Sequence, residues 1–265
     1  MNIFLREIKA NTKSLILWSI GMFFMIISGM VKYSGFSASG QSMNEIMSQV
    51  PKSIRAVLGM GDFDLTKASG FYGMLYLYLL IMVTIHASML GANIISKEER
   101  DKTTEFLMVK PVSRTGIITA KLLAALANVI ILNIVTLALS ISIVGQYSIG
   151  EEITGEILIL MAGMFVLQLV FLFIGTGIAA ASRNPHISAS ATTTVLLVSF
   201  ILSAVIDMNS RLEGLKYLTP FKYFEAKNMM YGGGIDLVFI LLSLAIIAIL
   251  VGVTYVFYNK RDLNV

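Results

Sequence analysis

The side chains able to do acid–base or metal chemistry are few in this chain of 265 residues. Two pairs of adjacent carboxylates begin at Glu98 and at Glu151, and the two histidines are His86 and His186. No histidine lies near either pair in sequence, and the H-E-x-x-H pattern of zinc proteases does not occur. We therefore predict no catalytic residue and no metal ligand. An intramembrane enzyme that brings acids and histidines together in space stays one alternative.

Other reactive patterns are missing from the sequence as well. The chain has no cysteine, which excludes thiolate nucleophiles and Cys-ligated metals. It has no G-x-x-x-x-G-K-[ST] loop to cradle ATP phosphates and no G-x-S-x-G nucleophile elbow. We expect this chain to bind no cofactor of its own.

Composition places the chain in a membrane. Hydrophobic residues make up 56% of it, charged residues only 14%, and the mean hydropathy is +0.80. A soluble domain carries about 25% charged residues. The net charge of +4 therefore reports membrane topology first, and we expect no nucleic-acid partner.

Apolar runs of about eighteen residues or more recur, and each is long enough to cross a hydrocarbon core of about 30 Å. They predict an all-α membrane protein with a single transmembrane domain over residues 1–265. Because proline interrupts a helix, Pro185 separates the fourth span from the fifth. The six predicted spans cover residues 14–31, 70–95, 116–145, 153–182, 187–207 and 235–258.

Lysine and arginine are divided unequally between the two sides of these spans. With the N-terminus inside, twelve of them lie on the cytoplasmic side and eight on the other. The positive-inside rule therefore favours an N-in, C-in protein of the cell (cytoplasmic) membrane.

The residues before the first span alternate apolar and charged side chains. Phe4 and Ile8 are interleaved with Arg6 and Lys9. This pattern predicts a short amphipathic helix lying at the membrane surface, with its cations toward anionic headgroups. The alternative is a basic flank that only orients the first span.

The segment from residue 96 to 121 concentrates charge, with six of the twenty Lys and Arg and four carboxylates. The second span is predicted to run past the membrane face to Arg100 and to break at residues 101–103. A short helix then presents Phe106 and Leu107, Pro111 ends it, and a new helix starts at Arg114. An exposed apolar pair rimmed by charge marks an interaction site of the helix-in-groove kind. The alternative is a loop that folds this pair back onto its own bundle.

Polar side chains inside the spans are functional candidates. We assign His86, Asn93 and Thr193 to a possible transport pathway. Interhelical hydrogen bonds explain three others: Asn128, Asn133 and Gln168. The spans are otherwise uniformly apolar, which favours hydrophobic or amphipathic cargo. Aromatic residues around Pro220 are typical of membrane-interface anchors.

Two stretches carry a resemblance to a known family. "SKEERDKTTEFLMVKPVSRTGIITAKLL" (residues 96–123) is similar to the cytoplasmic loop between the second and third spans of ABC-2 type transporter permeases. "YLTPFKYFEA" (residues 217–226) resembles the segment before their sixth span. The resemblance covers nearly the whole chain and is closest to short permeases of bacterial exporters, whose ATPase is a separate chain.

This resemblance implies a function. The chain would be the permease subunit of an ATP-driven exporter, paired with a second copy or a related permease in the lipid bilayer. ATP and Mg²⁺ would be bound by the ATPase subunit, and the coupling helix between spans two and three would be Thr103–Val109. A membrane sensor or immunity component with the same fold is the alternative. The implied ATPase contacts are Glu98, Glu99, Arg100, Thr103, Thr104, Glu105, Phe106, Leu107, Pro111 and Arg114.

Overall fold

The computed structural model describes residues 2–38, 49–51, 54–55, 58–60, 63–104, 112–148, 150, 152–182 and 184–260. Within these residues, six helices are long and apolar enough to cross a membrane. They are α1 (Ile3–Ala38), α4 (Ala68–Arg100), α6 (Arg114–Tyr147), α7 (Thr154–Ala181), α8 (Ser188–Met208) and α10 (Leu237–Lys260). The all-α fold and the six spans are confirmed, and the largest differences in their bounds fall on α1.

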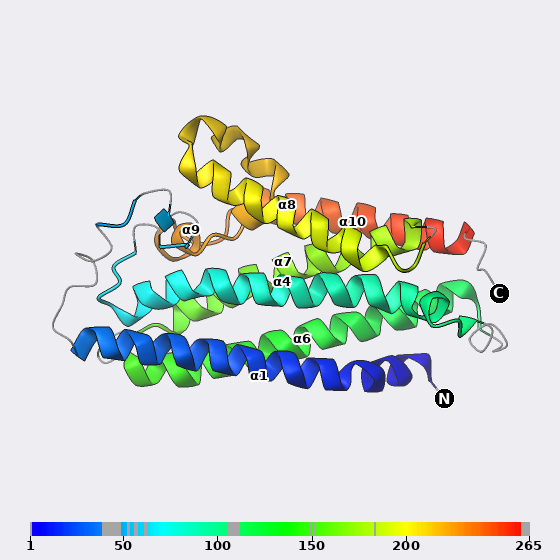
Figure 1. Cartoon of the computed structure of the whole chain (residues 1–265), viewed down its shortest axis with the longest axis horizontal. Helices are drawn as coiled ribbons and strands as arrows, with labels where there is room; N and C mark the ends of the chain where they lie inside the picture. The colour runs from blue at the N-terminus through cyan, green and yellow to red at the C-terminus, as the bar shows by residue number, and fades with distance from the viewer. Residues whose placement is uncertain are drawn as a thin grey trace.

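The long helices run along one axis in layers (Figure 1). α4 and α7 lie in the middle, with α1 and α6 on one side and α8 and α10 on the other. In its most apolar window, α4 has 67% of its residues buried, whereas α10 has 17%. The outer helices therefore present apolar side chains outward, as helices in contact with lipid or a partner do.

The start of α1 and the end of α10 lie at the same end of the bundle (Figure 1). We call this the terminal end; the end of α4 and the start of α6 are also there. The other end, which carries α9 (Ala226–Tyr231) and the 3-10 helices η1 (Ser210–Leu218) and η2 (Pro220–Lys222), is the distal end.

α4 and α7 approach closely because each has a glycine at the contact. A Cβ on Gly91 would lie 2.1 Å from the Leu172 carbonyl oxygen, and one on Gly175 would lie 2.4 Å from the Ser88 carbonyl oxygen. Small residues let membrane helices pack backbone to backbone. This contact fixes the position of α4, whose two ends carry the groups described below.

The helix ends follow local signals in the sequence. α4 ends at Arg100, and Lys102 has the positive φ of 55° that breaks the helix. α6 begins after Ser113, whose hydroxyl oxygen accepts a hydrogen bond from the Gly116 N–H at 3.1 Å. The break around Pro185 lies between the end of α7 and the start of α8. These three predictions are confirmed.

The N-terminal segment differs from its prediction. Residues 3–13 are the first turns of α1, which continues as one helix to Ala38. The prediction of a separate helix before the first span is therefore wrong, whereas its position at the membrane surface stays a prediction. The physical reason is that this segment has its own buried contacts with α4 and α6, which continue those of the rest of α1.

Three of the aromatic residues near Pro220 also differ from their prediction, whereas Tyr217 and Tyr231 are exposed. Phe221, Tyr223 and Phe224 are buried rather than placed as surface anchors. The Phe221 ring lies 5.2 Å from that of Phe171, and Tyr223 stacks on Phe239 with ring centroids 4.9 Å apart. The η2 segment is thus folded into the distal end of the core.

Candidate functional site

Charged side chains of three helices meet inside the terminal end. We call this group the terminal ionic cluster. It consists of Arg6 and Glu7 from α1, Lys97 and Glu98 from α4, and Lys121 from α6. In sequence these segments lie far apart, so the cluster exists only in the folded chain.

Glu98 stands at the centre of the cluster. It accepts a hydrogen bond from Arg6 Nη2 at 2.9 Å and another from Lys121 Nζ. Lys121 is fully buried and also donates to the carbonyl oxygen of Ile94 at 2.6 Å. A buried ammonium group is stable only with such partners. Glu98 therefore joins α1 and α6 to the end of α4.

Glu7 makes the second link of the cluster. Its side chain is fully buried, accepts from Arg6 Nη2 at 2.9 Å, and is paired with Lys97. The cluster contains three cations and two carboxylates, so each acid has more than one positive partner. This satisfies both acids despite their burial.

A simple spacing brings these groups together. On each helix an isoleucine lies one turn before the charged residue, so both point from the same face. Ile3 precedes Glu7 and packs against Ile117, which precedes Lys121. The buried Ile94 likewise precedes Glu98. Apolar contacts between the helices thus place the three charges next to one another.

The implied ATPase contacts that the structure describes lie at this same end of the molecule. The Arg100 side chain donates to Asn93 Oδ1 at 2.8 Å and to Asp101 at 3.1 Å. The Thr103 N–H donates to the Glu98 carbonyl oxygen at 2.8 Å. The chain after α4 is therefore tied to the residue at the centre of the cluster.

The remaining implied contacts are partly described. Thr104 is buried, and Glu99 is half-buried on the last turn of α4. Arg114 is exposed and donates to the Asn259 carbonyl oxygen at 3.2 Å, which connects the start of α6 to the end of α10. Four implied contacts lie outside the described residues: Glu105, Phe106, Leu107 and Pro111.

The residues assigned to a surface helix have different roles from those predicted. Phe4 and Ile8 pack against the buried core between α4, α6 and α7, and Arg6 belongs to the ionic cluster. Lys9 is exposed. Three of these four side chains thus face other helices, because α1 lies against α6 and α4.

The three residues assigned to a pathway are not brought together. His86 is buried, with its ring 5.6 Å from that of Trp18 on α1. Asn93 is the acceptor for Arg100 at the terminal end. Thr193 donates to the Ala189 carbonyl oxygen within its own helix, at 2.9 Å.

Of the predicted interhelical hydrogen bonds, one pair is confirmed. The Asn133 amide donates to Gln168 Oε1 at 3.1 Å, from α6 to α7. Asn128 instead donates to the Ala124 carbonyl oxygen of its own helix.

Sequence reasoning missed Glu7, Lys97 and Lys121 as members of a site. Lys121 was counted as the last charge of the loop, although it lies two turns inside α6. A lysine that deep in an apolar helix requires a carboxylate partner. This requirement is the sequence signal that could have identified the cluster.

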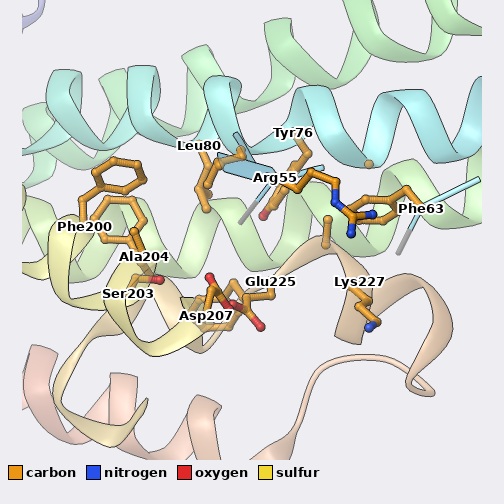
Figure 2. A pocket seen from close by; sticks show the side chains of 16 residues that line it. Arg55, Phe63, Tyr76, Leu80, Phe200, Ser203, Ala204, Asp207, Glu225 and Lys227 are labelled. Carbon is orange, nitrogen blue, oxygen red and sulfur yellow. The ribbon is translucent and has the colours of Figure 1, made fainter. Parts of the chain in front are cut away.

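The distal end contains a cavity of about 390 Å³. Figure 2 shows α4 side chains, including Tyr76 and Leu80, on one wall and Phe200 and Ala204 of α8 on another. None of His86, Asn93 and Thr193 lines this cavity.

Six helices long and apolar enough to cross a membrane point to a multi-pass membrane protein. The family model described as ABC-2 family transporter protein matches residues 1–263. The chain therefore belongs to the ABC-2 family of transporter proteins and is a multi-pass membrane protein. No curated protein matches it.

Proposed function

We propose that this chain is the permease subunit of an ATP-driven exporter of the cell membrane, with a separate ATPase docking at the terminal end. Membership of the ABC-2 family supports the permease role. The excess of Lys and Arg on the side of the termini supports the N-in, C-in orientation. In this arrangement the terminal end lies in the cytoplasm, where ATP is available.

The observation that carries the proposal is the terminal ionic cluster. The end of α4 and the start of α6 flank the segment that contains the proposed coupling helix, Thr103–Val109. Glu98 pairs with both Arg6 and Lys121 at the base of that segment. A displacement of the segment by an ATPase is therefore passed to α1, α4 and α6 together, because buried ion pairs resist separation.

The partner supplies the chemistry that this chain lacks. The sequence has no Walker A loop, so ATP and Mg²⁺ belong to the ATPase subunit in this proposal. A second permease, either a copy of this chain or a related one, completes the transporter. The uniformly apolar spans favour hydrophobic or amphipathic cargo.

Purification of the tagged chain from its native membrane tests the docking. An ATPase with a Walker A motif should copurify with the wild-type chain, and Phe106→Asp should remove it, because a carboxylate cannot enter an apolar groove. Gly214→Asp is the matched control: Gly214 lies at the distal end in η1, with nothing within 4 Å of an added Cβ. Unchanged copurification and ATP turnover in Phe106→Asp would contradict the proposal.

The direction of transport has its own test. Inside-out membrane vesicles that contain the complex should accumulate an amphipathic tracer when ATP is added. A complex that hydrolyses ATP but moves no tracer in either direction would favour a sensor instead.

A further inference from the structure

The distal cavity combines an apolar lining with charged groups from three parts of the chain. Its volume of about 390 Å³ lies within the range of about 300–1,000 Å³ that is usual for small-molecule sites. Aromatic rings surround much of it, including Phe200, Phe221 and Phe224. A cavity of this size and lining suits a small amphipathic molecule.

The two carboxylates of the cavity already have a cation of their own. Lys222, which is buried, donates to both Asp207 and Glu225. Glu225 also accepts from the Asn228 amide at 3.0 Å. Burial raises the pKa of Glu225 above its ordinary value. These acids are therefore poor partners for a cationic ligand.

Arg55 differs from the two carboxylates in its hydrogen bonding. Its side chain lines the cavity between Tyr76 and Phe63 (Figure 2), and its buried Nε has no hydrogen-bond partner among the described residues. A buried guanidinium nitrogen without a partner is costly, whereas an anion in the cavity would satisfy it. Among the described residues that line the cavity or pair with its lining, three are cations (Arg55, Lys222 and Lys227) and two are carboxylates (Asp207 and Glu225).

We propose that the distal cavity is a binding site for an amphipathic anion, with its carboxylate or phosphate at Arg55 and its apolar part beside Phe200 and Ala204. Figure 2 shows these two positions at different ends of the same cavity, which gives the ligand a direction. Every group of the site belongs to one chain and lies at the distal end. The assignment therefore holds whether or not an ATPase docks at the terminal end.

The absence of cysteine in the chain allows a direct test without the ATPase. Ala204→Cys puts one thiol in the cavity of the full chain in nanodiscs, and Leu77→Cys, on a second half-buried lining residue, is a second reporter. Gly214→Cys is the control outside the cavity, at a site open to solvent. The rate of alkylation by an uncharged water-soluble maleimide is measured with decanoate, decyl phosphate, decanol or decyltrimethylammonium present.

We expect decanoate or decyl phosphate to slow alkylation in the cavity but not at Gly214→Cys. Which of the two protects better tells a carboxylate site from a phosphate site. Adding Arg55→Gln to either reporter should raise the concentration needed for protection about tenfold, since a charge-assisted hydrogen bond is lost. Equal protection by decanol, stronger protection by decyltrimethylammonium, no protection at all, or full protection in Arg55→Gln would each overturn the proposal.

Discussion

The two ends of this molecule each hold a buried lysine beside carboxylates, but the connections differ. At the terminal end, Lys121 pairs with Glu98, and Arg6 reaches the same carboxylate from 92 residues away. At the distal end, Lys222 pairs with Asp207 and Glu225, only 15 and 3 residues away. The first arrangement joins three long helices, while the second organises one local segment beside a cavity.

Exposure to solvent separates the two ends further. In the terminal pair, the Lys121 side chain is 0% exposed and that of Glu98 is 8% exposed. In the distal group, Lys222 is 7% exposed, but Asp207 and Glu225 are 37% and 29% exposed. Water therefore relieves a broken distal pair more than a broken terminal pair. Similar ion pairs therefore have different roles: at the terminal end they hold three helices together, and at the distal end they lie beside a cavity that solvent reaches.

The largest effect is expected from breaking the terminal pair on one side. Glu98→Leu leaves the Lys121 ammonium buried, with the Ile94 carbonyl as its remaining hydrogen-bond acceptor among the described residues. Stability should fall by about 3–5 kcal/mol, the usual cost of an uncompensated buried charge. Thermal unfolding of the purified protein in nanodiscs measures this loss.

A double variant shows how much of this stability loss comes from the unpaired charge and how much from lost packing. Glu98→Leu with Lys121→Met replaces both charges by apolar groups, which is often neutral or stabilising for a buried pair. The double variant should therefore be more stable than Glu98→Leu alone. If the stability losses of the single variants Glu98→Leu and Lys121→Met add up to the loss of the double variant, the two residues are not coupled. The pair then has no structural role.

Breaking the distal ion pairs should lower the stability less than breaking the terminal pair. Lys222→Met leaves Asp207 and Glu225 facing each other without their shared cation, yet both reach solvent. We expect a loss of about 1–3 kcal/mol, the range for a polar group left without its partner. The same unfolding measurement ranks it against Glu98→Leu, and a greater loss for Lys222→Met would reverse the comparison.

The smallest effect concerns pH and is confined to the distal end. Because burial raises the pKa of Glu225, ionisation of this group costs more in the folded chain than in the unfolded one. Its contribution to stability is present below its ordinary pKa of 4.5 and is lost as the pH rises through the folded value. Between about pH 4 and pH 7, the unfolding temperature of Glu225→Gln should therefore fall less than that of the wild type. An equal change of unfolding temperature with pH in Glu225→Gln and the wild type would mean that Glu225 titrates alike in the folded and unfolded chains.

The distal end also shows where sequence reasoning stops. The six spans were predictable because length and hydropathy decide which segments cross a membrane. The breaks at Lys102 and around Pro185 were predictable because they depend on local backbone chemistry. The burial of Phe221 and Phe224 was not, since aromatic residues near a span end suit both the lipid interface and a packed core.

The same limit applies to the terminal site. Residues 96–121 indicate a charged functional segment, but nothing local tells which acid meets which base. The pairing of Lys97 with Glu7 spans 90 residues and depends on how α1 packs against α4 and α6. The continuity of α1 was missed for a related reason: the charges of its first turns read as a surface pattern until their partners were known.

The most direct test of the central claim is ATP turnover by the complex of this chain with its ATPase. The comparison is between Glu98→Leu with Lys121→Met, which removes the terminal pair without leaving a lone charge, and Gly214→Asp at the distal end. We predict that the double variant keeps its ATPase but loses at least about fivefold in turnover, the lower end of usual coupling free energies. Gly214→Asp should behave as the wild type. Wild-type turnover in the double variant would show that the ATPase does not act through the terminal ionic cluster.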